Sequence, residues 1–314
     1  MNKNSRLGLW VLIAGGVLAA AARTAQICAG TDMTSGFLKD VNGFFMDFCF
    51  WGAVLLTIAG AVAAAVLDRK KGAAYYDTPV SRITDGRAAA IGFAMLVPAV
   101  GALYEGYCEA VIPAESNISP SPFMMFVNFL FGAAMVVTAF VILYQKEFKP
   151  GLGFATVCGA AYYTLRGIGI FMEKMAVTTV PEHLINCISV ILSAIFFMQL
   201  AKLLSGNEGK RTREALTVSG AAAAATVLGN SIAVFGSMLF GSDEVASRIV
   251  FSASDAELLH QQLRGVDAYF MSLVPPADAA AGIFIVVTLI VLYMKSAQAE
   301  VGDIPAETEQ EDGE

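Results

Sequence analysis

The residues best placed to do chemistry in this sequence are polar side chains inside or at the ends of long apolar segments. They are Arg23, Glu105, Glu109, Arg166, Glu173 and Asn230. A charged side chain within a membrane helix is costly, so such residues are rare and commonly mark binding sites, proton paths or ion pairs. Counted along the helical rise, the six positions fall in the half of the membrane near the outer helix ends. They define the candidate site.

Glu105 and Glu109 are four residues apart, so they share one face of a helix. Two carboxylates so close resist double ionisation unless a cation lies between them. Arg166 is the cation available at similar depth, and Glu173 follows it by seven residues on the same helix face. We therefore expect Arg166 to pair with Glu105 or Glu109.

Two interpretations of these residues are open. In the first, Arg23, Glu105, Glu109, Arg166 and Asn230 line an outward-facing pocket for a small polar solute, zwitterionic or anionic, or for a lipid headgroup. In the second, the same residues form an ion-pair cluster that fastens helices together, while charges at helix ends reach the membrane interface. Either interpretation requires helices that bring the residues together.

Eight long apolar segments supply those helices. The chain is 56% hydrophobic and 15% charged, against roughly 25% charged residues in soluble domains. A membrane helix needs about 20 apolar residues, and a helix satisfies its own backbone hydrogen bonds in lipid. We expect spans at Leu7–Cys28, Phe45–Leu67, Ala88–Ile112, Pro122–Tyr144, Leu152–Met175, Glu182–Leu204, Ala215–Phe240 and Ala277–Met294. The fold class is therefore all-α, a polytopic membrane helix bundle of eight transmembrane helices.

Lysine and arginine are distributed unequally between the loops on the two sides of the membrane. Fourteen of the twenty lie on the side of both termini. The positive-inside rule places that side in the cytoplasm, and we expect a multi-pass protein of the cell membrane. The first segment also resembles a signal peptide, with Lys3 and Arg6 before an apolar run and alanines before Arg23. The repeat described next favours a retained helix.

The odd-numbered spans align with one another without gaps. Placing Arg23, Leu103, Arg166 and Asn230 in register also aligns the two ends of these four spans. The chain is thus interpreted as four copies of a two-helix hairpin, with chance similarity of apolar helices as the alternative. Glycine and alanine are dense in the odd spans and phenylalanine in the even spans. Because small residues let membrane helices approach closely, we expect the odd spans to form an inner ring.

The chain divides into two parts. Residues 1–299 form the transmembrane domain, which includes an extracytoplasmic loop at 241–276. In this loop Ser254 and Glu257 have the spacing of a capping box and predict a short helix. Residues 300–314 carry seven acidic side chains and predict a disordered cytoplasmic tail. Without these seven charges the net charge of −7 becomes zero, and no basic patch suggests a nucleic-acid partner.

Three functions are compatible with these patterns. The first is binding, with or without transport, of a small polar solute; the second is a non-catalytic subunit or scaffold that packs against a partner membrane protein. The third, least favoured, is an intramembrane enzyme that uses Glu105 or Glu109 as acid or base. The sequence has two histidines and no nucleotide-binding, zinc-protease or nucleophile-elbow motif, so no cofactor or metal is expected. The lipid bilayer is the one partner that every interpretation shares.

The charge distribution predicts the topology of two loops. Cysteines introduced at Lys71 and Ser116 should be labelled by an impermeant reagent from opposite sides of the membrane, because the two loops flank a single span. Accessibility labelling in intact cells and in inverted vesicles measures this. Labelling of both positions from the same side would contradict the topology.

Overall fold

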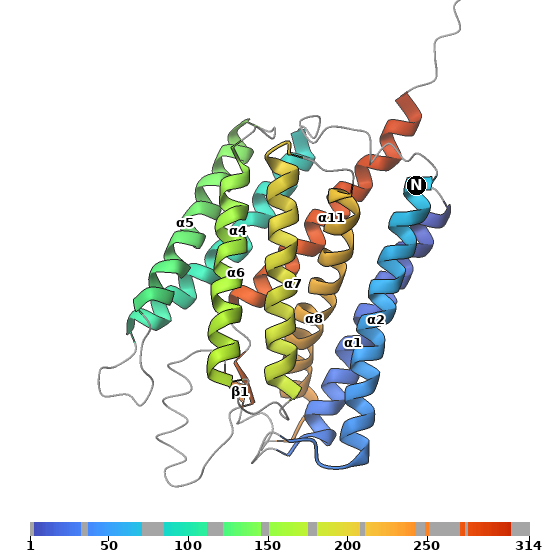
Figure 1. Cartoon of the computed structure of the whole chain (residues 1–314), viewed down its shortest axis with the longest axis vertical. Coiled ribbons are helices and arrows are strands. Elements are labelled where there is room, and N and C mark those ends of the chain that lie inside the picture. Colours follow the sequence, from blue (N-terminus) through green and yellow to red (C-terminus); the bar gives the residue numbers. More distant parts are fainter. Residues whose placement is uncertain are drawn as a thin grey trace, which may run out of the picture.

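In the part of the chain that the structure describes, eight α-helices run side by side in one bundle (Figure 1). The computed structural model describes residues 3–32, 37–70, 85–111, 122–145, 151–174, 181–207, 211–242, 249–250, 271–273 and 276–302. The helices are α1 (Lys3–Ala25), α2 (Val41–Lys70), α4 (Asp85–Val111), α5 (Pro122–Gln145), α6 (Gly153–Lys174), α7 (Pro181–Leu204), α8 (Thr212–Phe240) and α11 (Pro276–Gly302). A single π-helical turn, η1 (Gln26–Gly30), continues α1.

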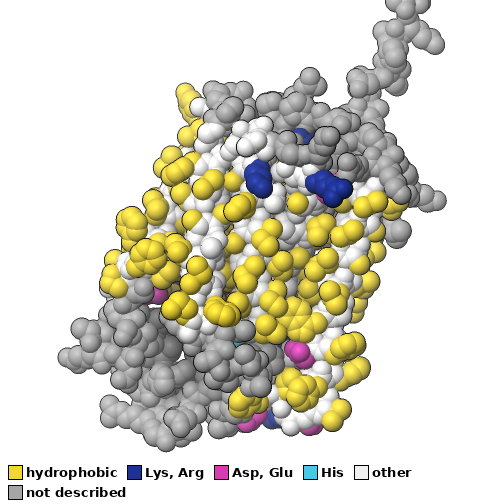
Figure 2. All heavy atoms as spheres, viewed as in Figure 1, with side chains coloured by type: hydrophobic (Ala, Val, Ile, Leu, Met, Phe, Trp, Pro, Cys, Tyr) yellow, Lys and Arg dark blue, Asp and Glu magenta, His cyan; other side chains and the backbone are white. Residues whose placement is uncertain are grey.

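Six helical segments of the described chain are long and apolar enough to cross a membrane. They are Ile13–Gly30, Val41–Leu67, Gly86–Val111, Pro122–Gln145, His183–Leu204 and Thr212–Phe240. Apolar side chains cover the middle of the bundle surface in this view, and charged side chains show toward both ends (Figure 2). A multi-pass membrane protein is therefore supported. The expectation of eight spans is met in part, because α6 lies outside this set and the apolar part of α11, Ala277–Leu292, is shorter.

Sequential helices pack as hairpins. Contacts join α1 to α2, α4 to α5, α6 to α7, and α8 to α11, and α8 also contacts α1, α2 and α7. The start of α1 and the end of α11 lie at the same end of the bundle (Figure 1). These pairs have the order that the hairpin interpretation expects, and the proposed internal repetition stays a prediction.

The expected inner ring of odd spans is wrong. The membrane segments of α1 and α2 are equally buried, each with 39% of its residues inside, and those of α7 and α8 each reach 56%. Small residues do allow close approach, but they do not decide which helix is central. Phenylalanines of even spans, Phe131, Phe196 and Phe197, fill the core and bury their own helices.

Glycine does set the spacing within the α1–α2 hairpin. A side chain at Gly15 would collide with Thr57, one at Gly60 with Val11, and one at Gly30 with the backbone of Gly43. These helices approach too closely for a β-carbon at those points, as small residues permit in membrane proteins. The close contact holds the end of α1 and η1 against the start of α2.

An aromatic core fills the centre of the remaining helices. Tyr162 stacks on Phe131 with ring centroids 4.8 Å apart, and Tyr163 stacks on Phe197 at 5.4 Å. Phe197 in turn stacks on Phe284 of α11 at 5.7 Å. Rings from α5, α6, α7 and α11 thus pack as one group. The two tyrosines are fully buried within it, so their hydroxyl groups need polar partners.

Helix α11 begins inside the bundle rather than at its end (Figure 1). Ala277, in its first turn, is completely buried. The apolar segment Ala277–Leu292 is about 24 Å long at the helical rise, against roughly 30 Å for the hydrocarbon layer. The positive end of this helix therefore lies among the other helices.

The loop between α8 and α11 departs from the all-α expectation by one short pairing. Strand β1 (Ile249–Val250) pairs in parallel with β2 (Met271–Leu273). The short helix expected behind Ser254 lies outside the described residues. Of the disordered tail expected at 300–314, residues 300–302 belong to α11 and the rest lies outside the described residues. The proposed division into domains stays a prediction.

Close packing of α4 on α5 predicts a selective effect of glycine substitution. A β-carbon at Gly132 would lie 2.7 Å from Cγ of Leu103 and 3.1 Å from the carbonyl oxygen of Ala99. Gly132→Leu should therefore lower the free energy of unfolding by about 1–3 kcal/mol, as overpacking does. Thermal melting in detergent measures this.

Gly52 of α2 is the matched control, because a β-carbon there meets nothing within 4 Å. Gly52→Leu should leave stability unchanged or raise it slightly, since leucine is the better helix former. Equal losses in the two variants would contradict the packing described.

Candidate functional site

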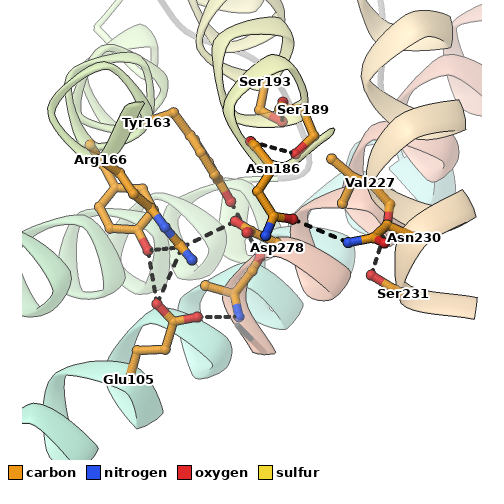
Figure 3. A network of polar contacts seen from close by, with 12 residues as sticks. Glu105, Tyr163, Arg166, Asn186, Ser189, Ser193, Val227, Asn230, Ser231 and Asp278 are labelled. Atoms are coloured by element: carbon orange, nitrogen blue, oxygen red, sulfur yellow. Dashed lines mark hydrogen bonds and ion pairs between the residues drawn. The ribbon is translucent and has the colours of Figure 1, made fainter. Parts of the chain in front are cut away.

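Arg166 of α6 contacts two carboxylates from two other helices. Its Nη1 donates to Oε2 of Glu105 on α4 at 3.3 Å and to Oδ1 of Asp278 on α11 at 3.1 Å. The same nitrogen lies 2.8 Å from the hydroxyl oxygen of Tyr162. The three charged side chains converge from separate helices (Figure 3). We call Glu105, Tyr162, Arg166 and Asp278 the Arg166 cluster.

Glu105 also caps the buried start of α11. Its Oε1 accepts the backbone N–H of Ala277 at 2.8 Å, and its Oε2 accepts the Tyr162 hydroxyl at 3.1 Å. The first N–H groups of a helix have no partner within the helix, and the helix dipole favours negative charge there. Glu105 therefore supplies a charge-assisted hydrogen bond to a helix end that the surrounding apolar residues could not satisfy.

The aromatic core holds this cluster in place. Tyr162 and Tyr163 are adjacent on α6 and both are fully buried. The Tyr163 hydroxyl donates to the carbonyl oxygen of Ala277 at 3.2 Å, one residue before Asp278. The stacked rings fix both tyrosines, so the start of α11 is bound through Tyr163 as well as through Glu105.

Part of the hydrogen-bonding capacity of the cluster is unused. All three contacts of Arg166 use Nη1, which leaves Nε and Nη2 without a partner among the described residues. Within the same part of the chain, Oδ2 of Asp278 also has no partner. With two carboxylates and one guanidinium, the cluster has a formal charge of −1 when all three groups are ionised. An arginine edge and a carboxylate oxygen are thus available side by side.

A second cluster surrounds Arg23, at the junction of α1 and η1. Its Nε donates to Oδ1 of Asn230 on α8 at 3.2 Å, and its Nη1 donates to Oε1 of Gln26 at 2.7 Å. Gln26 donates to Oδ1 of Asp47 on α2 at 2.9 Å. Asn230 donates to Oδ1 of Asn186 on α7 at 3.1 Å. This Arg23 cluster joins α1, α2, α7 and α8.

The two clusters differ in accessibility. Arg23 is 2% exposed and Gln26 is completely buried. In the Arg166 cluster, the side chains of Arg166 and Asp278 are each 12% exposed, and that of Glu105 is 15% exposed. Arg166 lies eight residues before the end of α6, about 12 Å, so the accessible charge lies well inside the bundle. Arg23 itself is thus sealed, although Asp47 and Asn186 at the edge of its cluster are half-buried, whereas all three charged groups of the Arg166 cluster keep some exposure.

The structure distributes the expected site residues over two clusters rather than one. Arg166 and Glu105 are together, and Arg23 and Asn230 are together. Glu109 lies one turn farther along α4 and is half-buried. Glu173 is in the last turn of α6, and its side chain lies outside the described residues.

Asp278 and Asn186 were not among the candidate residues expected from the sequence. Both fall within expected spans, Ala277–Met294 and Glu182–Leu204. The signal for Asp278 was present, because a proline followed by an acidic residue marks a helix start. What the sequence did not show is that this helix starts inside the bundle.

Neither cluster has the ligands of a metal site among the described residues. In the part of the chain that the structure describes, no group of three or more histidine, cysteine or acidic side chains could hold a metal ion. The five cysteines are all unpaired thiols. The Arg166 cluster can bind charged groups of both signs by hydrogen bonds, because it presents free donors and a free acceptor.

Removal of the Arg166 guanidinium should destabilise the protein strongly. Arg166→Met leaves Glu105 and Asp278 facing each other without a cation, and breaking a buried pair in this way typically costs about 3–5 kcal/mol. Chemical or thermal unfolding in detergent measures the loss. The double variant Arg166→Met/Glu105→Gln should recover part of it, because one orphaned charge is removed. A double variant no more stable than the single one would argue against the ion pair.

Comparison with known proteins gives no match, whether to family models, to curated proteins or to solved structures. Evidence on function therefore comes from the chemistry of the Arg166 cluster and its surroundings.

Proposed function

We propose that this multi-pass membrane protein binds a small zwitterionic solute at the Arg166 cluster. The proposal rests on one observation: hydrogen-bond donors and an acceptor without partners lie in neighbouring, partly exposed side chains. Arg166 has Nε and Nη2 free among the described residues, and Asp278 beside it has Oδ2 free. A solute with a carboxylate and an ammonium group complements both.

The chemistry of each half of the solute follows from these atoms. A carboxylate fits the planar edge of a guanidinium, which donates two parallel hydrogen bonds. An ammonium group is attracted to Asp278 and Glu105, because the cluster has one carboxylate more than it has arginines. A purely anionic solute gains the first interaction but is repelled by the two carboxylates. The zwitterion is therefore favoured over the anion.

Access supports binding from one end of the bundle. The charged side chains of the cluster keep 12–15% of their surface exposed. They lie toward the end opposite that of the two chain termini, because Arg166 follows the start of α6 by thirteen residues and precedes its end by eight. With the termini in the cytoplasm, as the lysine and arginine distribution favours, the solute would enter from outside.

We restrict the proposal to binding, without passage across the membrane. Thr156, Ser219 and Thr226 are three of the buried polar residues that a path to the other end could use. Thr217 and Thr288 are also buried, and their hydroxyls have no partner among the described residues. Each of the first three donates its hydroxyl to a carbonyl of its own helix. Such hydroxyls are already satisfied and offer a solute little.

The scaffold function is the alternative from another class. Under it, the Arg166 cluster only fastens α4, α6 and α11, as the Arg23 cluster fastens α1, α2, α7 and α8. A measurement of solute binding distinguishes the binding function from the scaffold function, because a purely structural cluster does not respond to small molecules.

The test compares related small molecules by thermal shift of the full chain in detergent. Each common amino acid is added, then the amine that lacks its carboxylate and the acid that lacks its amino group. At 100 times its dissociation constant, a ligand of the folded state stabilises by about 2.7 kcal/mol. At least one zwitterion should raise the melting temperature, and its two analogues should do so far less. An equal response to the amine alone would overturn the zwitterion assignment.

Asp278→Asn should abolish the response to the zwitterion, because the ammonium group loses its carboxylate. Asp47→Asn is the matched control. It makes the same change near the same end of the bundle, in the Arg23 cluster, and should keep the response. The absence of any response in the wild-type protein would favour the scaffold function.

A further inference from the structure

A groove on the outer surface of the bundle lies between α6 and α7, apart from both polar clusters. Its volume is about 460 Å³. The small residues Gly167 of α6 and Ala194 of α7 line it. The large apolar residues Ile168, Phe171 and Ile191 also line it and are exposed. Because this surface faces the lipid zone, the groove is open to the hydrocarbon layer.

The small residues account for the hollow. Gly167 has no side chain, and a β-carbon there would reach ordinary contact with Val190 Cγ1, 3.5 Å away. The hydroxyl of Thr164, which also lines the groove, donates to the carbonyl of Ala160 in its own helix. Because this hydroxyl is already bonded, the middle of the groove behaves as an apolar surface.

The groove becomes polar at one end only. Gln199 and Lys202 line that end, two to five residues before α7 finishes at Leu204. Lys202 is exposed and has no ion-pair partner among the described residues. The other end lies near Cys187, fifteen residues earlier, which is about 22 Å along α7. One leaflet of hydrocarbon is about 15 Å thick, half of the roughly 30 Å core, so the groove is long enough for an acyl chain.

We propose that this groove binds an anionic phospholipid. One acyl chain lies along the apolar part, between α6 and α7, and the phosphate lies at the ammonium group of Lys202 with Gln199 beside it. Charge complementarity selects this occupant, because a free cation at a helix end near the interface attracts an acidic headgroup. The length and the single polar end fit a lipid rather than a helix of a second copy, which would need apolar contact along its whole length.

The test is native mass spectrometry of the full chain in detergent, with phosphatidylglycerol or phosphatidylcholine added at equal concentration. The wild-type protein should retain phosphatidylglycerol about fivefold better, the ratio that one lysine near the headgroup gives. Lys202→Gln should bring retention of phosphatidylglycerol down to that of phosphatidylcholine. Ala194→Trp, which fills the groove, should reduce retention of both lipids.

Two control variants make the result specific. Arg87→Gln removes a cation near the start of α4, and Val137→Trp introduces the same side chain at an exposed position of α5. Both should keep the wild-type retention. Equal retention of the two lipids by the wild-type protein, or equal losses in Arg87→Gln and Lys202→Gln, would overturn the proposal.

Ala194→Leu, a smaller filler, replaces Ala194→Trp if the larger variant does not fold. Unchanged retention by a folded filler variant would overturn the location. A monomer–dimer shift caused by the filler, without any change in lipid retention, would assign the groove to a second copy instead.

Discussion

A guanidinium inside an apolar bundle must find its partners within the chain, and this constraint organises the structure. Arg166 takes one carboxylate from α4 and one from α11, at sequence separations of 61 and 112 residues. An unpaired charge at this depth is unfavourable by several kcal/mol, so arrangements that separate the three helices are disfavoured. Apolar faces can pack at several relative positions of the helices along their axes. The polar contacts select one of these positions.

The same constraint explains why Glu105 is tolerated inside the bundle. The start of α11 would place unsatisfied N–H groups among apolar side chains, where no water can bind them. Glu105 accepts the N–H of Ala277 with one oxygen and the Arg166 and Tyr162 donors with the other. The carboxylate is thus stabilised by an arginine and a helix dipole together. Two features that would each be unfavourable alone, a buried acid and a buried helix start, satisfy each other.

Much of the bundle followed from the sequence, because hydropathy and proline positions mark helices directly. The contact between Arg166 and Glu105 was also expected, since an arginine at that depth needs an acid at the same depth. What failed was the arrangement of helices around one another. Glycine density placed α1 in the centre, whereas α1 and α2 are equally buried. Arg23 and Arg166 were assigned to one pocket because they lie at similar depth. Similar depth in the membrane does not place two residues on the same side of the bundle. Arg23 bonds to Asn230, which bonds to Asn186, so Arg23 lies on the side of α7 and α8 instead.

Helix α6 shows how a segment of modest hydropathy can belong to a membrane bundle. Tyr162, Tyr163 and Arg166 lie on one face, where aromatic rings and carboxylates satisfy them. Thr164, Gly167 and Ile168 lie on the face that lines the groove. Neighbours in sequence point about 100° apart around a helix, so Arg166 and Gly167 face different surroundings. The mean hydropathy of the segment is lowered because it averages the two faces. No polar group of α6 described above faces the groove without a partner. The charged and hydroxyl groups of Tyr162, Tyr163 and Arg166 lie on the inner face, where α4 and α11 supply their partners.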